Sequence, residues 1–425
     1  MSEPTFAVLL LLVLAWAVTS RLLARSNVTG AIVFAVAGYA LANPDWGLLV
    51  VDVETPSIHL LAELTLALLL FSDAARVNVS QLRRDMAFPA RLLGIGLPLS
   101  IVIGSVLAAV MFDELSWALA GFVGATLAPT DAALSAQVIN DHRIPLRLRR
   151  VLNVESGLND GIATPIVVFT LAVAATQLGT TGHGESAGGS ALVDLALGVV
   201  VGIVVGFGSA RMIATGSRRQ WIIPGGRRVA TLAAALASFA LAVALDGNGF
   251  IAAFVAGAAF GAGLPEDVAD AEEVGELPEL LGEVMALAVW FLFGAALVPV
   301  ALDHASWSAV AYAFLSLTVV RMVPVALSLV GMGLDALTVA FVGWFGPRGL
   351  ASVVFALLAI EELGESKVVG QAIAIVTLTV LLSVVAHGVS AGPLGRRYVR
   401  AESHDDAAEA PRSRRLGSHD RRKGA

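Results

Sequence analysis

The chain has 425 residues, of which 57% are hydrophobic and only 14% are charged, and its mean hydropathy is +0.82. A soluble globular domain has roughly half apolar and about a quarter charged residues, so this composition excludes a soluble fold and indicates a protein of the lipid bilayer. The net charge of −7 argues against a nucleic-acid partner, and the absence of cysteine excludes disulfides and cysteine-based zinc sites.

Thirteen apolar runs come close to the length of roughly 20 residues that a helix needs to cross a bilayer. The second and ninth runs are short. We predict an all-α polytopic membrane protein whose transmembrane domain occupies residues 1–394. Residues 395–425 are polar, without an apolar period, and predict a short disordered tail. The runs lie near residues 5–23, 28–43, 57–75, 88–112, 115–139, 147–176, 189–213, 229–245, 249–264, 280–301, 305–331, 335–361 and 366–394.

Arginine is concentrated in alternate loops between these runs, and Lys367 is the only base in the intervening loops. Because basic residues are enriched in cytoplasmic loops, thirteen spans place the N-terminus outside the plasma membrane and the C-terminus in the cytoplasm. The acidic stretch 265–279 is predicted to be cytoplasmic as well, since acidic residues contribute little to this bias. The bases that carry the pattern are Arg21, Arg25, Arg76, Arg83, Arg84, Arg91, Arg143, Arg147, Arg149, Arg150, Arg211, Arg218, Arg219, Arg227, Arg228, Arg396, Arg397 and Arg400.

The fifth run, GATLAPTDAALSAQV, contains a proline at position 129, in the middle of the span. Proline has no N–H and clashes with the preceding turn, so a regular helix is expected to break here. Thr130 and Asp131 follow at once, and both are good N-cap residues for a second half-helix. Transporters use such breaks at membrane depth to coordinate ions. The alternative is a kink at which Asp131 serves only as a cap.

The sixth run, RRVLNVESGLNDGIATPIVVF, brings four polar side chains to one helical face. Glu155 and Asn159 are four residues apart, and so are Ser156 and Asp160. Ionisable residues inside a span cost roughly 2.5–3.5 kcal/mol each on insertion scales, so they are candidates for function. Other interpretations remain open: Glu155 as an interfacial residue, Asn159 as a contact between helices, and Asp160 as a structural residue.

Three further charges lie in or near spans. Arg348, in the stretch VGWFGPRGLASVVFAL, needs a partner in the membrane, and Glu155 is the best acid available. We expect Arg348 to neutralise that carboxylate, with direct substrate contact as the alternative. Asp73, in LALLLFSDAARVNVSQLRRD, is either a vestibule residue or an ordinary charge at a helix end. Arg321 is expected to extend towards the cytoplasmic surface.

Carboxylate, hydroxyl and freed carbonyl oxygens are hard ligands that suit hard cations. If Glu155 pairs with Arg348, little net charge remains at the site, which favours a monovalent ion such as Na⁺, Li⁺ or K⁺. A partly buried carboxylate beside another can hold either a proton or a cation near neutral pH, so the two compete. If the loaded site alternates between the two sides, this competition alone produces exchange. The nucleotide-binding pattern GxxxxGK[ST] is absent.

The stretches PTDAA, ESGLND, GWFGPRG and LLFSDAARVNVSQLRRD, in this order, resemble the sodium/hydrogen exchanger family of monovalent cation:proton antiporters, in its electroneutral Asn-Asp branch. The resemblance covers the whole membrane portion. It implies a fold of thirteen helices with inverted repeats and interrupted helices. It also implies a core domain that moves like an elevator, a dimerisation domain, a homodimer, and no cofactor beyond the transported cation and proton.

The resemblance also implies roles for individual residues. Asp160 resembles the main carboxylate that binds cation and proton, with Asp131, Thr130 and Ser156 as neighbouring ligands. Asn159 resembles the amide of the electroneutral branch. The remaining matches are Glu155 and Arg348 as the core ion pair and Asp73 at the cytoplasmic funnel. The second interrupted helix is expected in the C-terminal region 366–394.

Two other classes of function were considered. A cation channel or uncoupled carrier built on similar carboxylates would pass current without a coupled proton flux. An intramembrane hydrolase lacks support, since no serine has a convincing in-span histidine or lysine base. Antiport, with Na⁺ as the first candidate, is the function that the sequence favours, and an enzyme is not expected.

Overall fold

The computed structural model describes residues 3–25, 28–43, 45–51, 55–76, 87–180, 187–265 and 271–409. Within these ranges the regular structure is entirely helical, and it contains two π-helical turns, η1 and η2. The elements are α1 (Glu3–Arg25), α2 (Gly30–Leu41), α3 (Pro56–Ala75), α5 (Ala87–Arg91), η1 (Leu92–Gly96), α6 (Leu97–Met111), α7 (Trp117–Thr126), α8 (Ala136–Ile139), α9 (Leu146–Leu178), α10 (Ala187–Arg218), α11 (Pro224–Ala244), α12 (Gly249–Gly263), α13 (Ala271–Leu292), η2 (Phe293–Leu297), α14 (Val298–Asp303), α15 (Trp307–Leu317), α16 (Val319–Ser328), α17 (Ala336–Trp344), α18 (Leu350–Leu363) and α19 (Lys367–Glu409).

Each of the thirteen apolar runs corresponds to one of these helices or to a consecutive set of them. Nine segments of the described chain are long and apolar enough to cross a membrane, beginning with Glu3–Leu23 and ending with Lys367–Ala401. The other four runs contain either a short helix, as in α2 and α12, or a helix interrupted in its middle. The prediction of an all-α polytopic membrane fold is confirmed.

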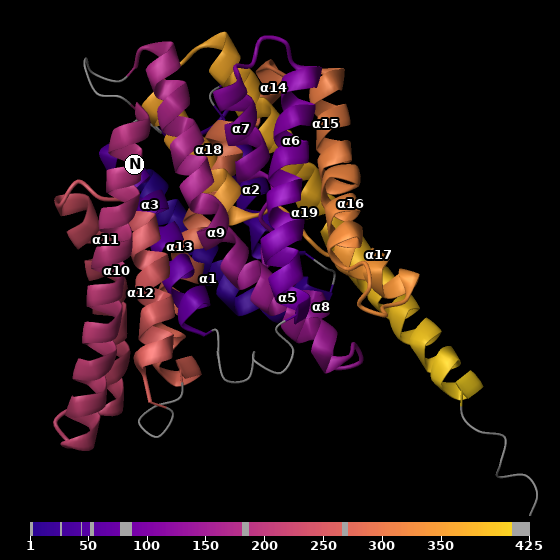
Figure 1. Cartoon of the computed structure of the whole chain (residues 1–425). Helices are drawn as coiled ribbons and strands as arrows, with labels where there is room; N and C mark the ends of the chain where they lie inside the picture. The colour runs from indigo at the N-terminus through magenta and orange to yellow at the C-terminus, as the bar shows by residue number, and fades with distance from the viewer. Residues whose placement is uncertain are drawn as a thin grey trace, which may run out of the picture.

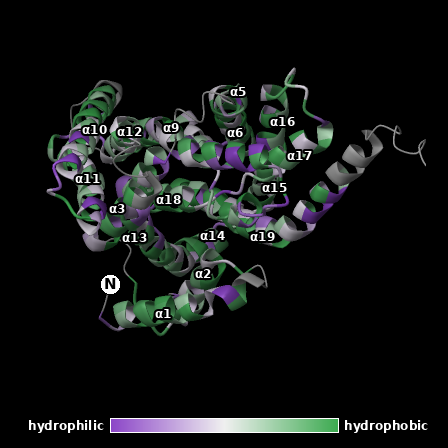
Figure 2. Ribbon diagram, turned by 90° about the horizontal axis from the view of Figure 1, so that it is seen from below, coloured by the Kyte–Doolittle hydropathy of each residue, from purple (hydrophilic) through white to green (hydrophobic). Residues whose placement is uncertain are grey.

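The helices pack in two groups (Figure 1). The α3 group contains α2, α3 and α10 to α13, and the α18 group contains α6, α7, α9 and α15 to α19. The groups meet where α3 packs against α9 and α18, where α13 packs against α18, and where α10 and α12 pack against α9. Figure 2 shows that hydrophobic residues colour most helices, including outlying ones such as α1, as expected of helices in lipid.

Two spans are interrupted rather than continuous. The first break, residues 127–135, separates α7 from the short helix α8 and contains Pro129, as predicted, although the regular helix resumes only at Ala136 rather than at Thr130. The second break, residues 345–349, separates α17 from α18. Both breaks lie in the interior of their spans.

The predicted location of the second interruption, in residues 366–394, is wrong. Helix α19 runs without a break through that range, from Lys367 to Glu409. The interruption lies one span earlier, in the sequence FGPRG, where Pro347 lacks an N–H and two glycines flank the Pro-Arg pair. Proline alone does not decide the matter, because Pro165 lies inside the continuous helix α9 and Pro393 inside α19.

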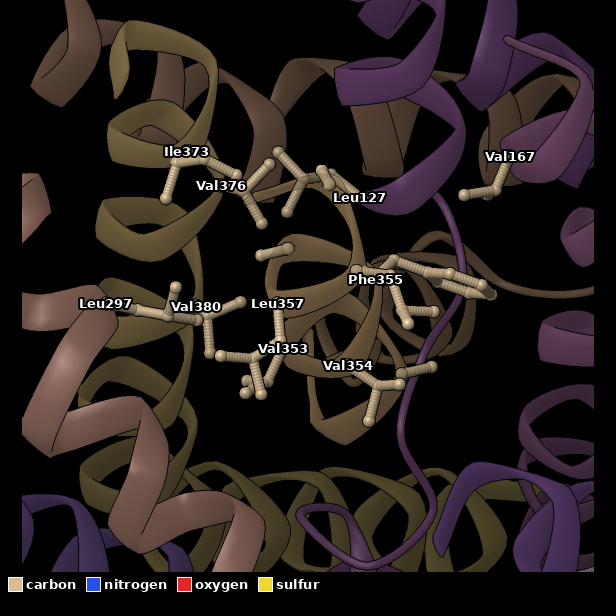
Figure 3. Close-up of a cluster of buried hydrophobic side chains, with 14 of the residues drawn as sticks. Leu127, Val167, Leu297, Val353, Val354, Phe355, Leu357, Ile373, Val376 and Val380 are labelled. Carbon is tan, nitrogen blue, oxygen red and sulfur yellow. The ribbon is translucent and has the colours of Figure 1, made fainter. Parts of the chain in front are cut away.

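Helix α18 forms the centre of the hydrophobic core. It is buried on all sides from Leu350 to Ala359, which is the pattern of a helix surrounded by other helices. Figure 3 shows its side chains packed among those of α19 and of neighbouring elements. The labelled members of this cluster are Leu127, Val167, Leu297, Val353, Val354, Phe355, Leu357, Ile373, Val376 and Val380. The start of α18, next to the second break, is therefore held rigidly inside the protein.

Two predicted irregular segments are partly helical. Helix α19 continues through residues 395–409, where a disordered tail was expected, and residues 410–425 lie outside the described chain. Helix α13 begins at Ala271, so most of the acidic stretch 265–279 belongs to a helix, while residues 266–270 lie outside the described chain.

Candidate cation site at the two helix breaks

Asp131 joins the two breaks. Its backbone N–H donates to the carbonyl of Pro347 (2.8 Å), and its Oδ2 accepts from the N–H of Leu350, the first residue of α18 (3.0 Å). Its Oδ1 accepts from the N–H groups of Ala133 (2.7 Å) and Leu134 (3.3 Å). The carboxylate therefore caps both α18 and the turn that follows Thr130, as a side chain at a helix N-terminus does.

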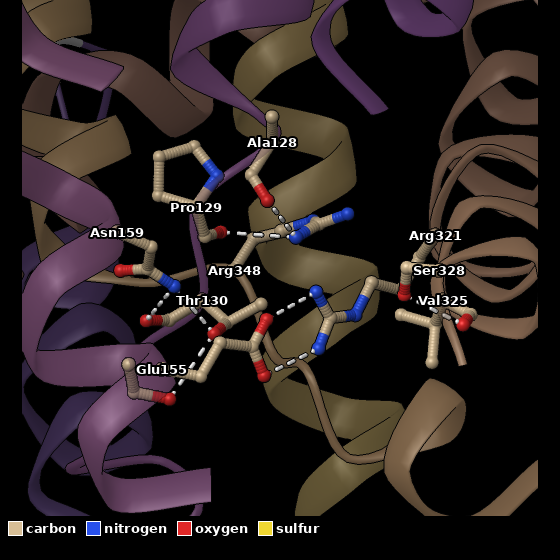
Figure 4. A network of polar contacts seen from close by, with 10 residues as sticks. Ala128, Pro129, Thr130, Glu155, Asn159, Arg321, Val325, Ser328 and Arg348 are labelled. Atoms are coloured by element: carbon tan, nitrogen blue, oxygen red, sulfur yellow. Dashed lines mark hydrogen bonds and ion pairs between the residues drawn. The ribbon is translucent and has the colours of Figure 1, made fainter. Parts of the chain in front are cut away.

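Arg348 makes the reciprocal contact from the second break to the first. Its guanidinium is fully buried, and Nη1 donates to the carbonyls of Ala128 (2.6 Å) and Pro129 (3.0 Å), as Figure 4 shows. These carbonyls follow the end of α7 and have no helical partner because the helix stops there. A positive charge at the C-terminal end of a helix also complements its dipole.

The expected ion pair between Glu155 and Arg348 does not form. Glu155 pairs instead with Arg321 of α16, whose Nη1 and Nη2 donate to the two carboxylate oxygens at 2.5 and 2.8 Å (Figure 4). Both side chains are 2% exposed, so the expectation that Arg321 extends to the membrane surface is also wrong. The physical reason is that the packing places the Arg321 guanidinium against both oxygens of the Glu155 carboxylate, while Nη1 of Arg348 contacts the carbonyls of the first break.

Arg321 is a residue whose role sequence reasoning missed. A signal was present, because it lies in the interior of the run 305–331, where a base must pair or reach the surface. The choice between those outcomes depends on which helix lies opposite, and that is a property of the tertiary packing.

The other polar residues of the sixth run face the first break, as predicted from their spacing on α9. Asn159 Nδ2 donates to the Thr130 hydroxyl (2.7 Å) and to the Thr130 carbonyl (3.2 Å). The hydroxyls of Thr130 and Ser156 lie 3.1 Å apart, within hydrogen-bonding distance. Thr130, Ser156 and Asn159 are each at most 3% exposed. The amide of Asn159 therefore holds the backbone of the break in place.

A cavity of about 300 Å³ lies between the two groups of helices and brings Asp73, Asp131 and Asp160 together. Ser156 also lines it, whereas Thr130 and Arg348 do not. Asp73 on α3 lies opposite Gly157 on α9, where a Cβ added at Gly157 would be in ordinary van der Waals contact with the Asp73 Cβ, at 3.6 Å. The cavity extends from Asp160 to the arginine-rich end of the bundle.

Six further polar side chains line this cavity and were not predicted as site residues: Ser72, Arg76, Asn140, Asn153, Glu279 and Glu283. Arg76 and Glu279 form a bidentate ion pair between the end of α3 and α13. Glu279 and Glu283 belong to the acidic stretch and the run after it, one helical turn apart, which is the only sequence signal that connects them.

The carboxylates of the cavity differ in what they contact. Three backbone N–H groups hold the Asp131 carboxylate, whereas the Asp160 carboxylate has no hydrogen-bond partner within the described chain. No three acidic or histidine side chains in the described residues converge closely enough to hold a metal ion by themselves. The site therefore consists of one free carboxylate, one anchored carboxylate and a nearby hydroxyl.

Comparison with known proteins agrees with this architecture. Residues 8–397 match the family described as "Sodium/hydrogen exchanger, transmembrane". The chain is 30% identical over 351 residues to the Na(+)/H(+) antiporter NhaP of Pseudomonas aeruginosa, which covers 77% of this chain and 78% of that protein. It is 25% identical over 301 residues to the K(+)/H(+) antiporter NhaP of Alkalimonas amylolytica, covering 70% of this chain and spanning only half of that relative's length.

The fold is also that of a solved structure, the sodium proton antiporter MjNhaP1 from Methanocaldococcus jannaschii. The TM-score is 0.73 at 17% sequence identity, and the match covers 93% of this chain and 98% of that chain. The family consists of transporters, so the expectation that the protein is not an enzyme is confirmed. The chain belongs to the sodium/hydrogen exchanger family of multi-pass membrane proteins.

Proposed function

We propose that the protein exchanges a monovalent cation for a proton across the plasma membrane, with Na⁺ as the first candidate and Li⁺ or K⁺ as the others. The observation that carries the proposal is the free Asp160 carboxylate, which lines the cavity together with the anchored Asp131 and the Ser156 hydroxyl. The named relatives include both an Na(+)/H(+) and a K(+)/H(+) antiporter.

The two carboxylates then have different roles. A carboxylate has roughly four lone-pair positions, and backbone N–H groups occupy three of those of Asp131. Asp131 can therefore offer about one lone pair to a cation, while Asp160 can offer all of its own. Ser156 adds a hydroxyl, and Thr130, which hydrogen-bonds to Ser156, orients it. Asp160 is the group at which cation and proton compete.

The charges around the site favour an electroneutral exchange of one cation for one proton. Glu155 is neutralised by Arg321, and Asn159 is uncharged. Asp131 and Arg348 lie on opposite breaks and cap opposite helix ends, so we assign both of them to holding the two breaks together. This leaves Asp160 as the titrating ligand, with Asp73 attracting cations from the arginine-rich end of the cavity.

His59 and Glu361 form a close polar contact at the other end of the junction between the helix groups. His59 Nδ1, at the start of α3, lies 2.8 Å from a Glu361 carboxylate oxygen near the end of α18. This arrangement supports alternating access, in which the α18 group moves relative to the α3 group to expose Asp160 to the other side. We also propose that the protein is a homodimer and that its C-terminus lies in the cytoplasm.

The test is dissipation of a preset proton gradient in vesicles that contain the purified protein, with Na⁺, Li⁺ and K⁺ added separately. We expect dissipation by Na⁺ that persists when the membrane potential is clamped, because the exchange is electroneutral. Asp160→Asn should abolish the dissipation, because an amide has no negative charge and does not take up and release a proton as a carboxylate does. Asp113→Asn, on an exposed loop away from the cavity, is the matched control and should behave as the wild type.

Three outcomes would contradict the proposal. Cation flux without a proton flux would indicate a channel or an uncoupled carrier. Dependence on the membrane potential would exclude electroneutral exchange. Full activity of Asp160→Asn would show that the carboxylate is the wrong one, and the ligand assignments would fall with it.

A further inference from the structure

A stripe of three polar residues on α19 faces the second break. Ser383, His387 and Ser390 are spaced four and three residues apart, so they lie on one face of the helix. Each contacts a residue at one end of the break, either Trp344 or Arg348. These three residues, called the α19 stripe below, do not line the cavity.

Two members of the stripe hold the backbone at the two ends of the break. Ser383 Oγ accepts from the N–H of Arg348 (2.6 Å), and His387 Nε2 lies 2.8 Å from the carbonyl of Trp344. Because a carbonyl can only accept, Nε2 of His387 must carry a hydrogen. Ser390 contacts only a side chain, since its Oγ accepts from Trp344 Nε1 (2.9 Å).

The contacts of Ser383 and His387 form a continuous chain. Ser383 Oγ lies 3.2 Å from His387 Nδ1, which is also 2.8 Å from the Ser383 carbonyl. Nδ1 accepts from the Ser383 hydroxyl when the ring carries hydrogen on Nε2 alone, and donates to the Ser383 carbonyl when Nδ1 also carries one, so the ring is tied to Ser383 in both cases. The contacts therefore connect the Arg348 N–H, Ser383, His387 and the Trp344 carbonyl in one series.

Solvent cannot replace these hydrogen bonds, because the residues Ser383, His387 and Arg348 are buried. Ser383 and Arg348 are fully buried, and His387 is 2% exposed. A buried N–H or carbonyl that loses its partner keeps the cost of its desolvation, so the break would rearrange to satisfy it. The His387 ring also lies against the Trp344 indole, with ring centroids 5.3 Å apart.

The backbone held in this way carries the groups that organise the cation site. The Arg348 side chain holds the carbonyls of Ala128 and Pro129 in the first break, directly before Thr130. The Pro347 carbonyl accepts from the N–H of Asp131. A shift of the second break would therefore move the Asp131 carboxylate relative to Asp160.

We propose that Ser383 and His387 are positioning residues of the cation site. They fix the second break and, through Arg348 and Pro347, the place of Asp131 in the cavity, without touching the cation themselves. The proposal rests on the proposed function, because it assigns these residues to the affinity of the exchanged cation.

The test uses Ser383→Ala and His387→Leu in vesicles, with the apparent KM for Na⁺ and the maximal rate measured separately. We expect each variant to raise KM by roughly tenfold or more, which corresponds to a misplaced ligand worth about 1.4 kcal/mol. Ser383→Thr keeps the hydroxyl, and His387→Gln keeps an N–H donor and an acceptor. These conservative variants should restore KM to within about threefold of the wild type.

Ser390→Ala is the matched control from the same stripe. It loses a bond to the Trp344 side chain but none to the backbone of the break, so KM should stay at the wild-type value. Thermal unfolding of each variant in detergent checks the fold. Ser383→Ala removes a single oxygen atom, so it keeps the test informative if His387→Leu does not fold.

An unchanged KM in folded Ser383→Ala would overturn the proposal. A fall in maximal rate alone, or conservative variants that fail to restore KM, would overturn it as well, since a general loss of structure predicts those results. The proposed function is judged by different variants. If wild type exchanges and Asp160→Asn does not, antiport stands whatever Ser383→Ala shows, whereas an inactive wild type overturns antiport itself.

Discussion

The two helix breaks are chemically opposite. The first break places Asp131 in a cavity that connects it with Asp73 and Asp160. The second break, residues 345–349, is buried throughout and carries Arg348. The Asp131 carboxylate caps the N-terminus of α18, and the Arg348 guanidinium contacts carbonyls beyond the C-terminus of α7. Each break therefore supplies a charge that complements the helix end at the other break.

This difference indicates that the two breaks have different roles. An interruption inside a membrane exposes backbone groups that must find partners within the protein. In the second break the N–H of Arg348 and the carbonyl of Pro347 are held by Ser383 and Asp131, which makes the segment a support for the first break. In the first break one carboxylate also faces the cavity, where a cation can become a ligand. We call the first break, which faces the cavity, the open break, and the second break, which is buried, the sealed break. The predictions below test whether the sealed break orients the open break and whether the open break binds the cation.

The largest effect is expected from breaking the buried ion pair next to the breaks. Glu155→Ala leaves the Arg321 guanidinium buried without its partner, which should destabilise the fold by about 3–5 kcal/mol. Thermal and denaturant unfolding in detergent measure this. The exposed pair of Lys367 and Glu114 is the control, and Glu114→Ala should cost no more than about 1 kcal/mol. Equal effects at both sites would show that burial does not decide the strength of the pair.

Arg348→Met removes the donor that the open break receives from the sealed one. The buried carbonyls of Ala128 and Pro129 then lose a hydrogen-bond donor, which should lower the stability of the fold by about 1–3 kcal/mol for each carbonyl left unpaired. Exchange should fall more than stability, because these carbonyls precede Thr130 and Asp131. Arg348→Lys, which keeps a charged donor, should recover part of the exchange. If Arg348→Met exchanges cations normally, the sealed break does not orient the open one.

Gly349→Ala tests the contact between the breaks by sterics alone. A Cβ at this position would overlap the Asp131 carboxylate and displace it from the N-terminus of α18. We expect a higher KM for Na⁺ and a loss of about 1–3 kcal/mol in stability, as for an overpacked core position. Gly208→Ala, on α10 with open space around its added Cβ, is the control and should be neutral or slightly stabilising. A wild-type KM in Gly349→Ala would mean that Asp131 can move without affecting binding.

The smallest effect is expected at the exposed N-cap of α17, at the very edge of the run 335–361. Asp335 caps α17 by accepting from the N–H groups of Leu337 and Thr338, at 3.1 Å each. Partial desolvation acts to raise the pKa of Asp335, but hydrogen bonds from Thr338 and Leu337 outweigh it and lower the pKa below its usual value. Asp335→Ala should cost about 0.5–2 kcal/mol at neutral pH.

The lowered pKa of Asp335 also predicts the sign of a pH dependence. Its contribution to stability is present above the unfolded-state pKa of about 3.9 and is lost as the pH falls through the lower folded-state value. The difference in melting temperature between wild type and Asp335→Ala should therefore shrink on acidification. Asp335→Asn, which caps without titrating, should not show this part of the pH dependence. A difference that grows at low pH would contradict the assignment.

Local patterns in the sequence predicted much of the site. The spacing of Ser156, Asn159 and Asp160 indicated one helical face, and the structure places Ser156 and Asp160 at the cavity. Pro129 predicted an interruption at the correct place. The roles of Asp160, Asp131, Thr130 and Ser156 as ligands remain predictions until the transport experiments are done.

The errors at the two breaks concern contacts between distant parts of the chain. Glu155 and Arg321 are 166 residues apart, and the sequence offered two bases for one buried acid. The second break was expected one span too late, because that expectation came from the resemblance alone and no motif in residues 366–394 located it; Pro393 lies there inside the continuous helix α19. What distinguishes Pro347 is the set of partners that the break finds on α19 and at Asp131.

The sequence by itself determined that this protein is a bundle of membrane helices, where one helix breaks, and which acidic face carries the chemistry. These properties follow from hydropathy, proline geometry and helical periodicity, which act over a few residues. Only the tertiary structure decided which arginine neutralises Glu155, how Arg348 is used and how Ser383 and His387 hold the second break. A buried charge or backbone group needs a partner wherever the packing provides one, and local sequence does not specify which helix lies opposite.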